Sequence, residues 1–208
     1  MSALADVLDA LARAVDDDPP DEAALGTITL HPHQRSAVRD IRASFAEFGG
    51  ALLADDAGLG KTYTALAIAR DHASCSVAAP ASLREMWRAA SASADVPVSF
   101  ISLEALSRGQ APAPARLLIV DEAHRAANTI TARYRTLALA AEGSLVLLLT
   151  ATPVRNRHDE LDALLALFLG GRADRLSDAA RARCIIRRSA SASAGIPAIQ
   201  AHQAIRAR

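Results

Sequence analysis

The chain has 208 residues, 51% of them hydrophobic, and its 23 basic residues balance 23 acidic ones. This composition is typical of a globular domain and excludes a disordered chain, because it offers enough apolar surface for one good-sized core. The zero net charge excludes a general attraction to nucleic acid or to an anionic membrane, so binding of either kind would need a local patch of charge.

The first predicted element is an amphipathic helix within residues 2–15, whose apolar residues recur on one helical face. The acidic, proline-containing stretch 16–22 breaks this pattern, and we therefore interpret residues 1–22 as an N-terminal helix followed by a linker. A second helix is expected to begin after Pro32 and to end at the glycine pair 49–50. Its inner face should carry four apolar side chains, Val38, Ile41, Phe45 and Phe48.

From residue 50 onward, short apolar runs alternate with helical patterns. The runs are ALLA, CSVAA, PVSFISL, RLLIV and SLVLLL, at 51–54, 75–79, 97–103, 116–120 and 144–149. This alternation predicts an α/β domain with a mainly parallel sheet flanked by helices, and in such a sheet ligands bind at the carboxyl ends of the strands. We expect the domain to occupy residues 23–170.

The motif GLGKT at 58–62 is separated from the first apolar run only by the residues DDA at 55–57. The phosphate-binding pattern G-x-x-x-x-G-K-[S/T] begins with glycine, and this chain has Asp55 there, but Gly60, Lys61 and Thr62 match. Backbone N–H groups of such a loop close around phosphate oxygens, while the lysine reaches the β and γ phosphates and the threonine hydroxyl binds Mg²⁺. Lys61 is also the only lysine in the chain. The alternative is a turn at the start of a helix with an accidental lysine.

A second motif, LLIVDEAH at 117–124, ends an apolar run in two carboxylates. Asp121 is placed to hold Mg²⁺, and Glu122 is placed to orient and deprotonate an attacking water. The alternative is an acidic helix N-terminus, where carboxylates are favoured by the helix dipole.

Two further stretches are weak by themselves. In LLLTATPVRN at 147–156, the hydroxyl groups of Thr150 and Thr152 could bridge the carboxylates and a nucleic-acid strand. In LHPHQ at 30–34, the Gln34 amide has the donor and the acceptor needed to read adenine.

Neither the histidines nor the cysteines predict a metal centre. His31 and His33 are two residues apart without a partner at ligand spacing, and Cys75 and Cys184 form no metal-type pair. The N-terminus lacks the pattern of a secretion signal, and the longest apolar run, 145–149, is too short to span a bilayer. We therefore expect a reduced, cytoplasmic protein without a membrane partner.

Taken in order, LHPHQ, LLADDAGLGKT, VAAPASLREMW, LLIVDEAHRAAN and LLLTATPVRN resemble the motifs of helicase superfamily 2. Within this superfamily, the chain most resembles the Swi/Snf-type DNA translocases, including the RapA-like branch. The resemblance runs from about Leu30 to Phe168 and implies the first RecA-like lobe of a P-loop NTPase, with ATP and Mg²⁺ as cofactors. Three departures, Asp56, Ala57 and Ala151, remove no catalytic group but could alter coupling.

The resemblance implies a role for individual residues. Gln34 would contact adenine. The residues that would hold the triphosphate are Gly58, Leu59, Gly60, Lys61, Thr62 and Tyr63. Thr62 and Asp121 would bind Mg²⁺, and Glu122 would activate water. The residues that would touch the DNA backbone or couple it to ATP are Pro80, Ser82, His124, Thr150 and Thr152.

Members of this family have a second RecA-like lobe, but no second series of apolar strands follows Phe168. CIIRRS at 184–189 resembles the segment between lobes, so we expect 171–208 to be an inter-lobe segment. The expected function is the ATP-hydrolysing motor lobe of a DNA-dependent ATPase. It would contact phosphates of double-stranded DNA and need a second lobe, in cis or in trans, for appreciable turnover. The alternatives are an RNA-directed helicase lobe of the same superfamily and a truncated nucleotide-binding interaction module without turnover.

Overall fold

The fold is known from a computed structural model that describes residues 23–151 and 158–188. Its centre is a six-stranded sheet in which every paired strand is parallel to its neighbour, in the order β5-β4-β6-β7-β3-β8. The strands are β3 (Gly50–Leu53), β4 (Cys75–Ala79), β5 (Ser99–Ser102), β6 (Leu117–Val120), β7 (Leu145–Leu149) and β8 (Ile185–Ile186). A small antiparallel hairpin, β1 (Ala24–Leu25) with β2 (Ile28–Thr29), precedes the sheet.

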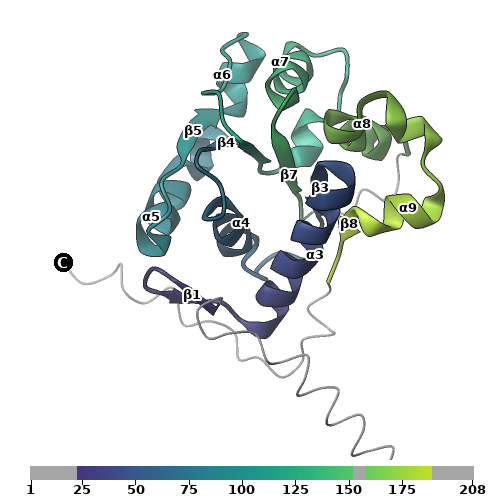
Figure 1. The fold of residues 1–208 in the computed structure, drawn as a ribbon. Helices are drawn as coiled ribbons and strands as arrows, with labels where there is room; N and C mark the ends of the chain where they lie inside the picture. The colour runs from purple at the N-terminus through teal and green to yellow at the C-terminus, as the bar shows by residue number, and fades with distance from the viewer. Residues whose placement is uncertain (1–22, 152–157, 189–208) are drawn as a thin grey trace, which may run out of the picture.

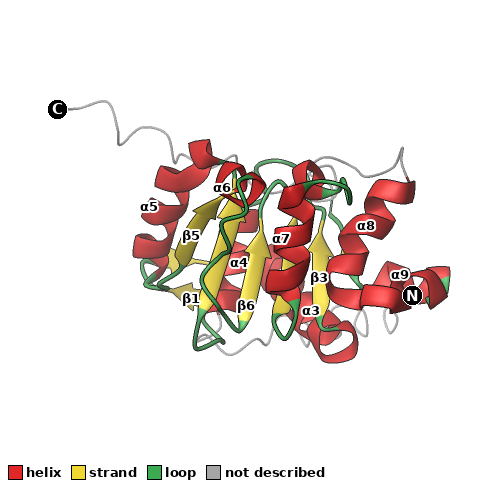
Figure 2. Ribbon diagram, turned by 90° about the horizontal axis from the view of Figure 1, so that it is seen from above, coloured by secondary structure: helices red, strands yellow, loops and turns green. Residues whose placement is uncertain are grey.

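Helices cover both faces of the sheet, as Figures 1 and 2 show. One face packs against α3 (Pro32–Phe48), α4 (Lys61–Ala69) and α5 (Arg84–Ala94). The other packs against α6 (Leu103–Ser107), α7 (Ala132–Ala141) and α8 (His158–Leu169). Short 3₁₀ turns follow β4, β6 and α8, at η1 (Ala81–Leu83), η2 (Ala123–Ala126) and η3 (Gly170–Arg175), and α9 (Asp178–Arg183) leads into β8.

The central strands are apolar on both sides because both sides are buried. In β3, Ala51 and Leu53 belong to the core under α3, α4 and α5, whereas Leu52 between them belongs to the core on the opposite face. Strands of this kind read as continuous apolar runs rather than as alternating ones. The five predicted strands and the predicted parallel α/β fold are confirmed.

Helix α3 begins and ends where its sequence predicts. Pro32 occupies the first turn, where its missing N–H is not needed, and Gly49 ends the helix in a left-handed conformation with φ of 79°. The four predicted inner residues, Val38, Ile41, Phe45 and Phe48, are all buried.

Several elements at the ends of the described chain were not predicted. The hairpin β1–β2 and strand β8 consist of two-residue strands, which are too short to produce a recognisable pattern. The segment 171–188, expected to lie between lobes, contributes α9 and an edge strand: the N–H groups of Leu52 and Ala54 donate to the carbonyl oxygens of Cys184 and Ile186, both at 2.8 Å.

Three predictions lie outside the described residues: the N-terminal helix with its linker, Thr152 with the rest of its motif, and the chain beyond 188. Among the helices that the structure describes, none is long and apolar enough to cross a membrane.

Candidate functional site

The predicted site residues follow strands that are neighbours in the sheet. The loop 54–60 follows β3, Asp121 and Glu122 follow β6, and Thr150 follows β7, while Pro80 follows β4. Because β4, β6, β7 and β3 are adjacent and parallel, these four segments meet at one edge, the carboxyl edge of the sheet.

The loop between β3 and α4 turns at two glycines just before the helix begins. Gly58 and Gly60 have φ of 86° and 75°, in the left-handed region that favours glycine. At Gly60 a Cβ atom would lie 2.3 Å from Nε2 of Gln34, so a larger residue would displace that amide. Lys61 and Thr62 then begin α4, whose N-terminal N–H groups point toward the loop.

The ammonium group of Lys61 lies inside this loop. Its Nζ donates to the carbonyl oxygens of Asp55, at 2.8 Å, and of Asp56, at 3.0 Å. Burial lowers the pKa of Lys61, while the negative charges of Asp55, Asp121 and Glu122 oppose that shift, as does Asp56. The two carboxylates of the second motif are therefore close enough to act on the lysine of the first.

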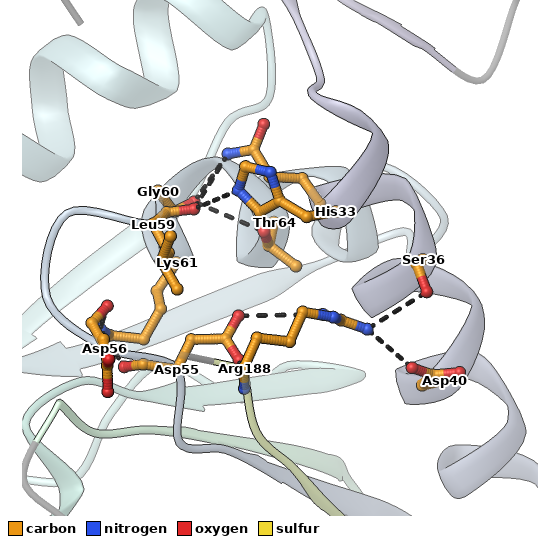
Figure 3. A network of polar contacts seen from close by, with 11 residues as sticks. His33, Ser36, Asp40, Asp55, Asp56, Leu59, Gly60, Lys61, Thr64 and Arg188 are labelled. Atoms are coloured by element: carbon orange, nitrogen blue, oxygen red, sulfur yellow. Dashed lines mark hydrogen bonds and ion pairs between the residues drawn. The ribbon is translucent and has the colours of Figure 1, made fainter. Parts of the chain in front are cut away.

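Asp55 stands where the phosphate-binding pattern has glycine, and its side chain connects the loop to the segment after β8 by a hydrogen bond. Its side chain is 3% exposed, and its Oδ1 accepts the backbone N–H of Arg188 at 2.7 Å. Burial raises the pKa of Asp55, and the charge and N–H of Arg188 oppose that shift. The Arg188 guanidinium also reaches Asp40 at 2.7 Å and Ser36 at 3.3 Å on α3, which Figure 3 shows. No sequence pattern connects Asp55 with Arg188.

The other half of the loop is held from α3. Nε2 of Gln34 donates to the carbonyl oxygens of Gly60 at 3.2 Å and of Leu59 at 3.5 Å, and Nε2 of His33 lies 3.1 Å from the Leu59 oxygen. Oε1 of Gln34 accepts the N–H of His31 at 2.8 Å. The predicted adenine contact of Gln34 stays a prediction, because in this structure both ends of its amide serve the chain itself. His33 was not predicted to contact the loop.

Asp121 is 8% exposed and each of its carboxylate oxygens accepts one hydrogen bond. Nε1 of Trp87 donates to Oδ2 at 3.0 Å, and the N–H of Glu122 donates to Oδ1 at 2.9 Å. Burial raises the pKa of Asp121, and these two hydrogen bonds oppose that shift. Trp87 is fully buried in the core, and it also contacts the predicted magnesium ligand.

Glu122 has a left-handed backbone with φ of 52°, which is unfavourable for a residue with a Cβ atom and recurs at functional sites. Its Oε2 lies 3.3 Å from Nδ1 of His124, and the same nitrogen lies 3.3 Å from Oγ1 of Thr150. The structure therefore brings together Glu122, His124 and Thr150, which the resemblance assigns to water activation and to coupling.

The remaining predicted residues lie around this centre. Pro80 is buried after β4, and Ser82 is exposed in η1; between them, the N–H of Ala81 donates to Oε2 of Glu104 at 3.1 Å. Tyr63 is half-buried and packs against the core under α3, α4 and α5, while the Thr62 hydroxyl donates to Sδ of Met86 at 3.8 Å.

These groups fit a magnesium–nucleotide complex. Mg²⁺ prefers oxygen ligands and is usually bound through one or two carboxylates together with phosphates and water, and the Thr62 hydroxyl and Asp121 carboxylate are of that kind. Within 23–151 and 158–188, no cluster of three or more His, Cys, Asp or Glu side chains could hold a metal ion by itself. Cys75 and Cys184 are buried and free, and burial raises the pKa of Cys75 to about 12.

No protein-family model matches the chain. It is 33% identical over 159 residues to the SWI/SNF-related matrix-associated actin-dependent regulator of chromatin subfamily A-like protein 1 of Bos taurus, which covers 64% of this chain and 17% of that protein. The Xenopus laevis protein of the same name is 32% identical over 164 residues, covering 66% of this chain and 17% of that protein. The chain thus spans about a sixth of the length of the curated relatives it matches.

Solved structures show the same fold. The Sulfolobus solfataricus SWI2/SNF2 ATPase core in complex with dsDNA superposes with a TM-score of 0.66 at 18% identity, covering 83% of this chain and 47% of that one. The Sulfolobus solfataricus SWI2/SNF2 ATPase core domain superposes with a TM-score of 0.59, also at 18% identity, covering 80% of this chain and 44% of that one. Together with the curated relatives and the ordered motifs, these matches confirm that the chain contains a Swi/Snf-type, superfamily 2 helicase-like lobe with a RecA-like fold.

Proposed function

We propose that this lobe binds and hydrolyses ATP as part of a DNA-dependent ATPase motor that acts on double-stranded DNA. The observation that carries the proposal is the meeting of two motifs at the carboxyl edge of the sheet: Lys61 lies inside the loop that follows β3, and Asp121 and Glu122 follow β6. The named relatives support it, since one solved neighbour is an ATPase core in complex with double-stranded DNA.

In this proposal different residues of the chain bind the phosphates and the Mg²⁺ ion. Lys61 exchanges the carbonyl oxygens of Asp55 and Asp56 for phosphate oxygens, and the N–H groups at the start of α4 donate to the same phosphates. Thr62 and Asp121 hold Mg²⁺. Bound Mg²⁺ neutralises the charge that develops on the phosphate oxygens.

Glu122 orients the attacking water and accepts its proton. Its backbone is left-handed, and its carboxylate oxygen Oε2 lies 3.3 Å from Nδ1 of His124. Because His124 also contacts Thr150 at the end of β7, a displacement of that strand end would reach the carboxylate that handles water. This contact is the proposed route by which DNA binding is coupled to hydrolysis.

Rapid hydrolysis would also need arginines from a second RecA-like lobe, in cis or in trans, because such arginines stabilise the charge of the transition state. Arg188 is poorly suited to this role: its side chain is 18% exposed and is engaged by Asp40 and Ser36. We therefore expect the isolated lobe to bind ATP but to turn it over very slowly. A cytoplasmic location stays a prediction.

The proposal is tested by calorimetry of Mg²⁺-ATP binding to the chain and to Lys61→Ala. We expect at least a tenfold loss of affinity in the variant, because a half-buried cation inside the phosphate-binding loop is removed. Arg88→Ala is the matched control, since Arg88 is an exposed cation that pairs with Glu85 on α5. Equal affinity of Lys61→Ala and the unaltered chain would contradict the phosphate site.

The nucleic-acid half of the proposal is tested by DNA binding at several salt concentrations. Contacts to phosphates predict weak binding whose affinity falls steeply with salt and does not depend on sequence. Binding that is insensitive to salt would contradict it. A clear preference for RNA duplexes over DNA duplexes would instead favour the RNA-directed helicase lobe.

A further inference from the structure

Helix α5 contacts both side chains proposed to hold Mg²⁺, through two consecutive residues. Met86 accepts the Thr62 hydroxyl on its sulfur at 3.8 Å, and the indole N–H of Trp87 donates to Oδ2 of Asp121 at 3.0 Å. Thr62 and Asp121 belong to different motifs, 59 residues apart by their numbers, yet the same turn of one helix touches both.

The contact between Trp87 and Asp121 is fully enclosed. Trp87 is 0% exposed and belongs to the core under α3, α4 and α5, while Asp121 is 8% exposed. An indole N–H buried in an apolar core requires an acceptor, and a buried carboxylate requires donors, so each group satisfies the other. Hydrogen bonds to an ionised acceptor are also stronger than those between neutral groups.

Two hydrogen bonds fix the orientation of the Asp121 carboxylate. Trp87 donates to one oxygen and the backbone N–H of Glu122 donates to the other, so the carboxylate cannot rotate without losing one of them. Each carboxylate oxygen has two lone pairs, and one on each oxygen stays available for a cation or its bound water.

We propose that Trp87 is a positioning residue of the magnesium site, where its indole N–H holds the Asp121 carboxylate in the orientation that binds Mg²⁺. The inference rests on the proposed function and adds Trp87 to the residues of the proposed magnesium site. Partners that orient a metal ligand from behind commonly change metal affinity by 10–100-fold when they are removed.

Trp87→Phe tests the inference, because phenylalanine keeps an aromatic, apolar side chain but lacks the indole N–H; it is also smaller, so the loss of buried volume needs a control of its own. We expect the Mg²⁺ concentration needed for half-maximal ADP binding to rise about tenfold. Binding of ADP in EDTA, where Asp121 has no cation to hold, should stay within about twofold of the unaltered chain. A tryptophan with a merely structural role would leave the Mg²⁺ dependence unchanged.

Ile41→Val is the matched control. Ile41 is fully buried in the same core, on α3, and its side chain carries no polar group. Its shortening should lower the thermal midpoint without moving the Mg²⁺ dependence. The comparison separates a general loosening of the core from a change in the orientation of Asp121.

Fluorescence provides a second measurement that does not depend on Trp87→Phe. Trp87 is the only tryptophan in the chain, so its emission reports directly on the indole. We expect the emission of the ADP-loaded chain to change when Mg²⁺ is added, and Asp121→Asn to abolish that change.

The outcomes distinguish the two proposals. If the unaltered chain binds no Mg²⁺-ADP, the proposed function is overturned and this inference with it. If it binds, but Trp87→Phe shows the same Mg²⁺ dependence and the emission of the unaltered chain does not respond to Mg²⁺, the inference alone is overturned.

Discussion

The two halves of the phosphate-binding loop are held by different parts of the chain. The second half, 59–61, is held from α3, where Gln34 and His33 contact the carbonyl oxygens of Leu59 and Gly60. The first half, 54–56, is held from β8 and the residues that follow it. There, backbone hydrogen bonds to Ile186 and Arg188 continue the ladder of the sheet, and the Asp55 carboxylate accepts the N–H of Arg188.

The two halves therefore differ in how much of their conformation the sequence motif predicts and how much depends on contacts with distant parts of the chain. The second half obeys the phosphate-binding pattern, and its support lies 26 residues away along the chain. The first half departs from the pattern at Asp55, and its support lies 133 residues away. The departure is therefore a tertiary contact, and it places the conformation of the loop under the influence of the residues that follow β8.

The largest expected effect comes from breaking the support of the first half. Asp55→Ala removes the acceptor of the Arg188 N–H and one partner of its guanidinium, both largely buried. We expect the free energy of unfolding to fall by about 2–3 kcal/mol, as is usual when a buried donor loses its partner. Urea denaturation measures this loss, and ADP binding should weaken with it.

Asp40→Ala is the control for that variant. Asp40 also binds Arg188, but its side chain is 54% exposed, so its removal should lower the free energy of unfolding by less than about 1 kcal/mol. Equal losses in the two variants would show that the buried contact of Asp55 is not what holds the loop.

A smaller loss of unfolding free energy is expected when a side chain is introduced into the second half of the phosphate-binding loop. Gly60→Ala introduces a Cβ atom 2.3 Å from Nε2 of Gln34, in addition to the strain of a left-handed alanine, which is about 1–2 kcal/mol. Gly58→Ala carries similar strain at φ of 86° but meets no atom within 4 Å. The difference in unfolding free energy between the two variants measures the contact with Gln34.

Replacing Gln34 by alanine in the Gly60→Ala background should recover part of the loss, because the clashing amide is gone. If Gly58→Ala and Gly60→Ala are equally stable, or if Gln34→Ala adds its own loss in full, the close packing of Gln34 on the loop is contradicted.

The fold was predictable because its central strands are buried on both faces. Leu117–Val120 and Leu145–Leu149 are continuous apolar runs, and the positions that follow them, Asp121 and Thr150, meet at one edge whatever the side chains do. The motif residues Lys61, Asp121 and Glu122 could therefore be located from the sequence alone.

The supports of the site could not be located in this way. Trp87 lies 34 residues from Asp121 and Arg188 lies 133 from Asp55, and neither pair has a spacing set by a helix or a strand. Strand β8, which brings Arg188 to the loop, has two residues and no readable pattern. These contacts depend on how the elements pack, and a buried tryptophan or an arginine after a short strand has many other possible partners.

The smallest expected effect is on how the free energy of unfolding depends on pH. It tests whether burial or the charge of Arg188 dominates the pKa of Asp55. Burial raises the pKa of its carboxyl above the ordinary value of 3.8, so between the unfolded and the folded pKa the native state binds more protons than the unfolded state. The stabilising contribution of the protonated carboxyl is complete below 3.8 and is lost as the pH rises through the folded pKa.

Asp55→Asn keeps an oxygen for the Arg188 N–H but does not titrate. The variant should therefore gain stability relative to the unaltered chain as the pH rises from about 3.5 toward neutrality. Denaturation at closely spaced pH values measures this difference. A difference that stays constant or falls with pH would mean that Arg188 outweighs burial at this carboxylate, and that the link between the loop and the segment after β8 is an ordinary ion pair.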